Sequence, residues 1–418
     1  MPVGELGTNW SGNYAYRAAI LHRPETLAEL QELVGGARTI RALGSRHSFT
    51  AIADSTELIV LDRLPGAIAV DQARGTVSVP GHTTYATLAV ALHREGVALH
   101  NLASLPHISV AGAVATATHG SGNAKGNLAT AVRQLQMVTA DGELITIDAG
   151  APDFDGMVVG LGALGVLTRL TLAVEPHYEM RQRVYRGLGW EALFENFAQI
   201  TAAGESVSVF HRFGARTEQL WVKRRASADA FPDEMFGAPA ATTALHPVLG
   251  GDPINCTEQL GVAGPWSERL PHFRSGFMPS SGEELQSEFF VSRDDAVAAI
   301  EAVRELAGAI VPLLLVCELR TIAPDTLWLS PQYQRDTVAI HFTWRRQPEA
   351  VAPVVDQIEA ALAPFGPRPH WGKVFTADAS AIAREYPRMN DFRSLRRRLD
   401  PTGTFVNGWL RDRVLGIE

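Results

Sequence analysis

The sequence predicts an α+β protein with two domains. Its 418 residues are 46% hydrophobic, which is enough apolar material for two cores and too much for one ordinary domain. Short β-like and helical segments alternate up to about residue 180, and longer β-like segments with helices between them follow. Glu175-Pro176 separates the two halves and marks the predicted domain boundary.

The first half contains two predicted helices. One is expected over residues 18–34, because Pro24 stands near its start and apolar residues then recur at helical spacing up to Val34. The other is expected over residues 85–95 and should stop at Gly96. The predicted strands are residues 39–43, 58–61, 67–70, 76–79, 132–138, 144–147 and 166–174.

The second half predicts a sheet with helices on one face. Residues 226–282 are rich in Pro, Gly and Ser and are expected to form a long ordered surface loop. The predicted strands are residues 207–212, 219–223, 288–291, 313–320 and 337–344, and the predicted helices are residues 293–307 and 350–362.

Composition excludes several classes of protein. The net charge is -8 with no basic stripe, so we expect no nucleic-acid partner. Cys256 and Cys317 are too few for a disulfide framework and have no metal-ligand spacing, so we expect a reducing compartment and no metal site. No signal peptide and no membrane span are recognisable, and no long apolar stripe suggests self-association. We therefore expect a soluble, cytoplasmic monomer.

The most informative segment is Arg41-Ala-Leu-Gly-Ser-Arg-His-Ser-Phe49. Gly44 and Ser45 would let backbone amides approach a ligand closely, and successive exposed amides bind phosphate. His47 beside such a turn has the position of a nucleophile toward a bound cofactor. Taken alone, the segment is more typical of a surface loop that holds a hydrogen-bonded histidine.

A second segment, residues 111–122, consists almost entirely of small residues. This composition suits a backbone that lies against a flat, extended ligand, and the alternative is a tight contact between packed elements. Further on, Gly160-Leu-Gly-Ala-Leu-Gly165 matches the dinucleotide fingerprint G-x-G-x-x-G. A strand pattern follows it where that fingerprint needs a helix, so we reject a nicotinamide site.

Charged residues interrupt the apolar strands of the second half. Glu318 and Arg320 are two positions apart and should share one face of a strand, as should His341 and Thr343. Such charges are usually solvated or paired, but on a buried strand they need partners or a ligand. Together with His370 and Lys373 they would suit a ligand rich in hydroxyl groups. No Gly-x-Ser-x-Gly segment suggests a hydrolase.

Residues 41–49 and 111–122 together resemble the flavin-binding half of the vanillyl-alcohol oxidase family of flavoproteins. Residues 101–109, 317–320, 341–343 and 370–373 narrow the resemblance to the alditol-oxidising members of that family. It extends from about residue 8 to residue 407. Sugar-lactone oxidases and dehydrogenases of the same family are the alternative, because they share the flavin half more than the remainder.

The resemblance implies an FAD-binding domain of two small α/β subdomains, formed by residues 1–177 with residues 385–418 returning to it. It also implies a substrate-binding cap domain, residues 178–384, with a large antiparallel sheet flanked by helices. FAD would be bound covalently through the ring of His47 to the 8α-methyl carbon of the flavin, which requires a neutral imidazole. Neither cysteine lies in a segment that would add a second bond.

The implied reaction is oxidation of the terminal primary alcohol of a linear polyol, such as xylitol or sorbitol, to an aldose, with O2 reduced to H2O2. Lys373, with a pKa lowered by burial and by Arg320, would take the hydroxyl proton, and Arg320 would stabilise the alkoxide. Ala103 should lie near the flavin face at which oxygen reacts.

The resemblance also assigns site residues by function. The catalytic set is Lys373, Arg320, Glu318 and His341. The polyol-binding set is Ser104, Glu318, Arg320, Thr343 and Lys373. The FAD-binding set is Ala42, Leu43, Gly44, Ser45, Arg46, His47, Ser48, Ser104, Ser109, Gly112, Thr118, His119, Gly120, Ser121, Val166, Thr343 and His370.

Overall fold

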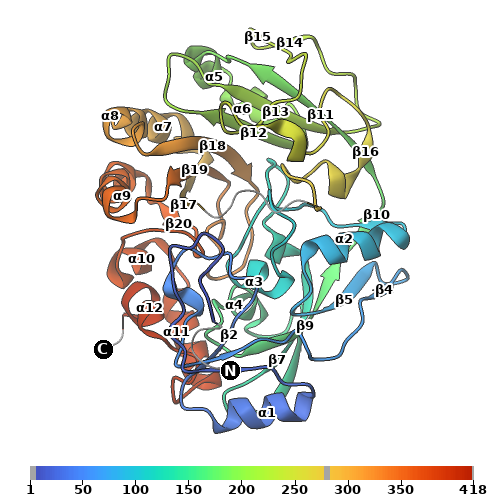
Figure 1. The fold of residues 1–418 in the computed structure, drawn as a ribbon, viewed down its shortest axis with the longest axis vertical. Coiled ribbons are helices and arrows are strands. Elements are labelled where there is room, and N and C mark those ends of the chain that lie inside the picture. The colour runs from blue at the N-terminus through green and yellow to red at the C-terminus, as the bar shows by residue number, and fades with distance from the viewer. Residues whose placement is uncertain (1–5, 277–282, 417–418) are drawn as a thin grey trace.

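Two small sheets and one large sheet organise the chain in the computed structural model, which describes residues 6–276 and 283–416. In Figure 1 the large sheet occupies the upper part, and the N-terminal half lies below it. The C-terminal helices lie beside this lower half. The fold is therefore α+β, as predicted.

The first half holds both small sheets. Parallel strands β1 (Ile20–His22), β3 (Glu57–Ile59) and β2 (Ile40–Ala42) form one of them. The other is antiparallel and has the order β4-β5-β9-β7-β8, formed by Ala69–Asp71, Thr76–Pro80, Val166–Ala173, Val132–Val138 and Leu144–Asp148. Strand β9 alternates buried and half-buried residues, the pattern of a strand covered on one face. It directly follows Gly165, so a strand stands where the dinucleotide fingerprint needs a helix, as predicted.

The helices of the first half are α1 (Leu27–Gly36), α2 (Tyr85–Arg94), α3 (Val110–Ala115) and α4 (Phe154–Val158). The prediction of a helix from residue 18 was wrong, because β1 occupies residues 20–22 and α1 begins only at Leu27. Thr26 fixes that start, since its hydroxyl accepts a hydrogen bond from the Glu29 amide at 3.1 Å. The short pair β6 (Val97–Ala98) and β10 (Glu175–Pro176) closes the first half.

The second half contains an eight-stranded antiparallel sheet with the order β16-β11-β13-β12-β18-β19-β17-β20. In that order its strands are Gly264–Pro265, Glu179–Arg186, Gln219–Arg225, Ser206–His211, Leu314–Ile322, Thr337–Arg345, Glu284–Ser292 and Arg368–Pro369. Strand β11 was not expected. Its buried face consists of Met180, Gln182 and Val184, with charged residues at most alternate positions.

Helices cover one face of the large sheet. Leu319 of β18 and Phe342 of β19 belong to the same core as Ile300 of α7 and Val355 of α9. These helices are α5 (Trp190–Glu195), α6 (Phe197–Thr201), α7 (Ala296–Arg304), α8 (Ala307–Ile310) and α9 (Pro348–Leu362). The opposite face of β18 and β19 is therefore free to turn toward the N-terminal half, and it carries Glu318 and Arg320.

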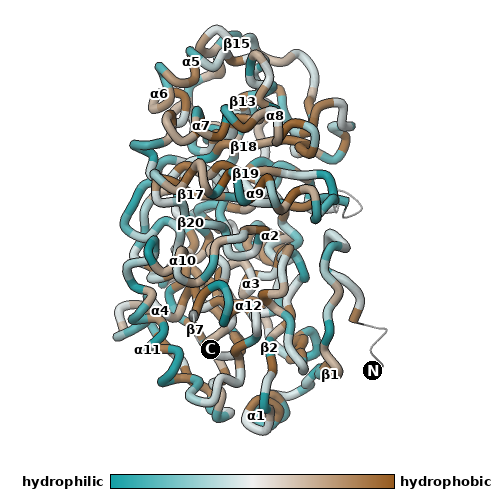
Figure 2. The backbone as a smooth tube through the Cα atoms, turned by 90° about the vertical axis from the view of Figure 1, so that its left-hand side faces the viewer, coloured by the Kyte–Doolittle hydropathy of each residue, from teal (hydrophilic) through white to brown (hydrophobic). Residues whose placement is uncertain are grey.

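The end of the chain returns to the N-terminal half. It forms α10 (Ala379–Glu385), α11 (Met389–Leu399) and α12 (Gly408–Leu410). The Ile40 amide donates to the Thr404 carbonyl at 2.9 Å, and the Asn407 side chain donates to the Ala51 carbonyl at 2.9 Å. Figure 2 shows the polar course of α11 at the surface. The division into residues 1–177 with 385–418 and residues 178–384 stays a prediction.

The expected loop at residues 226–282 is ordered where it is described, up to residue 276. It carries a small strand pair, β14 (Glu234–Met235) and β15 (Ala238–Pro239), and residues 277–282 lie outside the described part. Cys256 and Cys317 are both buried free thiols. Within the described ranges, every helix is too short or too polar to cross a bilayer.

Candidate active site

A cavity of about 850 Å³ separates the N-terminal half from the polar face of the large sheet. Both halves line it, so neither half forms the site alone. Its walls include most of the predicted site residues, namely Ala42, Leu43, Gly44, Ser45, Arg46, His47, Ser48, Ser104, Ser109, Gly112, Thr118, His119, Glu318, Arg320, His341, Thr343, His370 and Lys373, and also Ala103.

Three predicted residues do not line the cavity. Gly120 and Ser121 continue the small-residue segment behind its wall, where the Ser121 hydroxyl donates to the Val207 carbonyl and ties this segment to β12. The Val166 side chain is fully buried in a core beside α1, and its neighbours Gly165 and Leu167 line the cavity instead.

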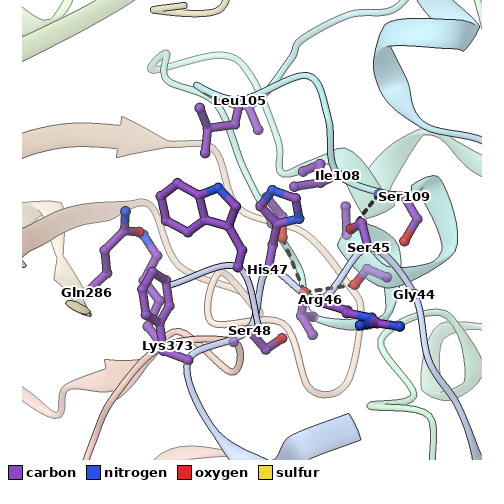
Figure 3. A pocket seen from close by; sticks show the side chains of 18 of the residues that line it. Gly44, Ser45, Arg46, His47, Ser48, Leu105, Ile108, Ser109, Gln286 and Lys373 are labelled. Atoms are coloured by element: carbon purple, nitrogen blue, oxygen red, sulfur yellow. Dashed lines mark hydrogen bonds between the residues drawn. The ribbon is translucent and has the colours of Figure 1, made fainter. Parts of the chain in front are cut away.

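The turn after β2 forms one wall of the cavity (Figure 3). Arg46 has a left-handed backbone, with φ of 61°, which turns the chain sharply before His47. The Ser45 hydroxyl accepts a hydrogen bond from the Ser109 amide at 3.0 Å. A Cβ atom on Gly44 would lie only 2.7 Å from the Ser109 hydroxyl, so glycine permits this close approach.

His47 is a neutral imidazole held in that wall. Burial lowers its pKa to about 4. Its ring stacks on Trp10 with centroids 5.7 Å apart. Both ring nitrogens are buried, have no hydrogen-bond partner among the described residues, and belong to a ring that borders the cavity. Figure 3 shows Gln286 and Lys373 on the far side of the same cavity.

A row of polar side chains crosses the opposite wall. In the sheet register, Phe210 of β12 pairs with Glu318 of β18, Glu318 pairs with His341 of β19, and His341 pairs with Glu288 of β17. Residues paired across antiparallel strands point to the same face. The register therefore aligns two carboxylates and an imidazole along one line.

Glu288 has three charged or titratable partners. It is 1% exposed. One carboxylate oxygen lies 2.7 Å from Lys373 Nζ, and the other lies 3.1 Å from Arg320 Nη2 and 3.2 Å from His119 Nε2. Burial opposes its ionisation, but the charges of Lys373 and Arg320 and the hydrogen bond with His119 outweigh that effect and hold its pKa well below the usual range.

Glu318 forms a second ionic group on β18, which β19 separates from β17. Oε1 lies 2.8 Å from His272 Nε2 and 3.5 Å from Arg320 Nε, and Oε2 lies 3.7 Å from His341 Nδ1. Burial opposes the ionisation of Glu318, whereas Arg320 and His272 favour it and keep its pKa well below the usual range. Arg320 also donates to the Ser104 hydroxyl at 3.2 Å, which connects the sheet to the loop that carries Ala103.

Burial lowers the pKa of the bases of the site. Burial lowers the pKa of Lys373, the charge of Glu288 opposes this, and Arg320 lowers it further, which is the direction expected from the sequence. Burial also lowers the pKa of His341 to about 4, and neither of its nitrogens has a hydrogen-bond partner. His370 Nδ1 accepts from the Gly372 amide at 3.0 Å.

Sequence reasoning missed Glu288 and His272. Glu288 was taken as the first residue of a strand, where a charge is normally solvated, but β17 begins four residues earlier, at Glu284. The argument used for Glu318, a carboxylate inside an apolar strand, would have identified it. His272 lies in the long loop, and its sequence gives no periodic signal.

The residues present fit FAD. The cavity has the volume of a large cofactor with a small substrate, and it is bordered by a glycine-containing turn and by an unpartnered neutral imidazole. Within residues 6–276 and 283–416, the one cluster compact enough for a metal ion is His119, Glu288 and His370. The Glu288 oxygens are already paired with Lys373 and Arg320, so a further cation there would be repelled.

Comparison with known proteins agrees with this geometry. A family model described as an FAD binding domain matches residues 18–148, and one described as D-arabinono-1,4-lactone oxidase matches residues 283–413. Cholesterol oxidase from Brevibacterium sterolicum has the same fold, with a TM-score of 0.79 over 97% of this chain and 96% of its own at 14% identity.

Two curated relatives cover nearly the whole chain. L-gulono-1,4-lactone dehydrogenase from Mycobacterium tuberculosis is 29% identical over 99% of this chain and 100% of its own length. Alditol oxidase from a Streptomyces species is 50% identical over 98% of this chain and 99% of its own length. On this evidence the chain belongs to the alditol oxidase family, within the FAD-dependent flavoproteins of the vanillyl-alcohol oxidase type.

Proposed function

We propose that this protein oxidises the terminal primary alcohol of linear polyols, such as xylitol and sorbitol, to the aldose and reduces O2 to H2O2. The observation that carries the proposal is the joint position of Glu318, Arg320 and Lys373 on the wall that faces His47 across one cavity. Fixed carboxylate, guanidinium and ammonium groups in a buried wall match a chain of hydroxyl groups, which donate and accept hydrogen bonds.

In this proposal the polyol lies along the polar row of the sheet. Glu318 accepts hydrogen bonds from the inner hydroxyl groups, and the Ser104 and Thr343 hydroxyls bind their neighbours. Arg320 and Lys373 hold the terminal hydroxyl. The buried wall excludes water, which strengthens each of these hydrogen bonds to charged groups.

Lys373 takes the proton of the reacting hydroxyl, since its lowered pKa makes the free amine accessible, and Arg320 stabilises the developing alkoxide. His341, which is neutral and lacks a hydrogen-bond partner, is the second candidate for the proton. FAD, when bound, supplies a two-electron acceptor that O2 can reoxidise with release of H2O2.

We further propose that FAD is attached covalently through His47. The support is a neutral ring whose two nitrogens lack partners, held in place by Trp10. A nucleophilic imidazole must be unprotonated, and burial provides that condition. Gly120, Ser121 and Val166 would contribute to the FAD site through their backbone or by supporting its wall.

A substrate panel with peroxide detection tests the function. Purified protein should release H2O2 with xylitol and sorbitol, more weakly with glycerol, and little with sugar lactones. The lactone activity is the alternative function, and it is less favoured because the lactone-oxidising relatives are more distant than the alditol oxidase. Lactone turnover exceeding polyol turnover would contradict the proposal. A cytoplasmic location and a monomeric state stay predictions.

A further inference from the structure

A buried lysine lies behind the polar wall of the cavity. Lys223 of β13 is 1% exposed. Its ammonium nitrogen lies 2.6 Å from the Leu270 carbonyl, 3.2 Å from the Pro271 carbonyl and 3.4 Å from His272 Nδ1. An ammonium group has three donors and no acceptor, so these three acceptors satisfy it fully. A charge that is buried this deeply needs such partners, because removing it from water is otherwise very unfavourable.

His272 connects this lysine to Glu318. Its Nε2 lies 2.8 Å from Glu318 Oε1. Burial, with the charge of Lys223, lowers the pKa of His272 to about 4, so the ring is neutral at pH 7 and has one donor and one acceptor. Burial lowers the pKa of Lys223 to about 7, and its ammonium form only donates. The ionised Glu318 only accepts, and it lies at 2.8 Å from Nε2. The tautomer is thereby determined, with the proton on Nε2.

Aromatic rings fix the plane of the imidazole. Phe210 and Trp221 meet it edge to face, with centroids 5.4 Å and 5.2 Å away. His272 therefore approaches Glu318 from one direction only. Within the described residues, Oε2 of Glu318 makes no hydrogen bond to the protein, since His341 Nδ1 is 3.7 Å away. Its lone pairs are left for a ligand in the cavity.

We propose that Lys223 and His272 are positioning residues, which hold Glu318 ionised with Oε2 directed at the polyol. The inference rests on the proposed function, because it assigns Glu318 the inner hydroxyl groups of the substrate. The charges agree with it. Glu288 and Glu318 are both buried and share Arg320, so Lys223 and Lys373 supply the remaining positive charge on either side.

The first test compares three variants. His272→Phe keeps the ring and removes the donor, and it should raise KM for xylitol about ten- to a hundredfold, the loss expected for a hydrogen bond to a charged group, with a smaller change in kcat. His272→Gln, which restores an N–H near the position of Nε2, should recover most of that loss. Lys223→Met should raise KM in the same direction.

His211→Phe is the matched control. His211 is equally buried and follows Phe210 on β12, but it faces the helices and packs on Trp190 and Phe213. It should lower stability and leave KM unchanged. If wild-type protein oxidises xylitol and His272→Phe, His272→Gln and His211→Phe all keep the wild-type KM, the positioning inference is overturned. The proposed function then stands.

A measurement without substrate tests the pair independently. In protein with 15N-labelled histidine, the ring signals that disappear in His272→Phe should show protonated Nε2 and unprotonated Nδ1. In Lys223→Met this preference should weaken. A wild-type ring protonated on Nδ1 would overturn the inference even if no polyol is oxidised.

Discussion

Lys373 is the residue whose loss should affect turnover most. Its amine lies against Glu288 and lines the cavity that His47 also lines. Lys373→Met keeps the length of the side chain and removes its proton-accepting nitrogen. Since general base catalysis contributes about 10²–10⁴-fold, kcat for xylitol should fall by that factor while FAD absorbance is unchanged. A turnover near wild type would shift the assignment to His341.

Glu288 controls the charge of Lys373. Glu288→Gln keeps the shape of the side chain and removes the anion that opposes the lowered pKa of Lys373. The pKa of the amine should therefore fall further, and the acid limb of kcat/KM against pH should move to lower pH, with kcat/KM reduced at least about tenfold. Glu301→Gln, on α7 and away from the cavity, is the matched control. An acid limb at the same pH in wild type and Glu288→Gln would show that Glu288 does not set the pKa of the catalytic base.

His47 decides whether the cofactor stays with the denatured chain. Acid precipitation of wild-type protein should leave the flavin in the pellet, because only a covalent bond survives unfolding. His47→Ala should release it into the supernatant, where its absorbance is measured. A yellow pellet from the variant would mean that another residue carries the bond.

Charged residues were predictable where the sequence placed them inside a recognisable strand. Glu318 and Arg320 were recognised because an apolar run precedes them, and the structure brings them together with Lys373 and His341. Lys223 was missed because it was taken as the last residue of its strand, a position normally open to water, whereas β13 continues to Arg225. Partners such as His272, which come from a loop, depend on tertiary contacts that have no local pattern.

At the scale of elements, the small-residue segment 111–122 contacts the loop of residues 101–104. A Cβ atom on Gly120 would overlap with Asn101 Oδ1 and with the Leu102 carbonyl. The backbone at Leu102 could make room for this atom only by shifting, which would also move Ala103 and Ser104. Gly120→Ala should therefore cost about 1–3 kcal/mol of stability and raise KM for polyol, as measured by thermal unfolding and by kinetics.

Gly308→Ala provides the control for this loop. Gly308 lies in α8, and a Cβ atom there would meet nothing within 4 Å. The substitution should leave KM unchanged and change stability by less than about 1 kcal/mol, in the stabilising direction. Equal effects of the two substitutions would show that the segment does not support the loop.

Strands with a clear period were predicted closely, and capped or charged elements were not. Residues 166–173 form β9, one residue short of the prediction, because buried and half-buried residues alternate there. The start of α1 was placed too early, since the capping hydroxyl of Thr26 determines it and not the apolar pattern. In β11 the arginines and glutamine conceal an alternating buried face, and only pairing with β13 makes it a strand.

Across the whole molecule, the site joins the two halves. The Gly122 amide donates to the Thr321 carbonyl at 2.7 Å, and Asn127 donates to Asp325 at 2.8 Å. These contacts link the small-residue segment to the end of β18, next to Arg320. These hydrogen bonds hold the wall that carries His47 and the wall that carries Glu318 together across the cavity. Sequence patterns predicted the halves, but the contacts that join them link residues about 200 positions apart and have no local pattern.

The many buried neutral histidines predict how stability depends on pH. The pKa is lowered by burial for His47, His82, His100, His119, His211, His246, His272, His341 and His370. In the unfolded chain each imidazole has a pKa of about 6.5. Below that pH the unfolded state therefore binds protons that the folded state does not. Stability should therefore fall as the pH decreases from about 7 toward 4.

Four carboxyl groups with a raised pKa act in the opposite direction, whereas Glu288 and Glu318, whose pKa is lowered, add to the loss of stability. Burial raises the pKa of Asp325 to about 6, and it also raises the pKa of Glu218, Glu284 and Glu359. These groups bind protons in the folded state first and so stabilise it on acidification. Nine histidines against four carboxyl groups leave a net loss, at most about 1.4 kcal/mol per pH unit for each uncompensated histidine.

The unfolding midpoint, measured at pH 7.5, 6.5, 5.5 and 4.5, checks this sign. His211 supplies the cleanest single contribution, because burial lowers its pKa to about 3 and its ring faces the helices, away from the cavity. His211→Phe should therefore lose less stability on acidification than wild type. A midpoint that rises from pH 6.5 to 4.5 would mean that the carboxyl groups dominate, and parallel curves for the two proteins would mean that His211 is protonated in the fold.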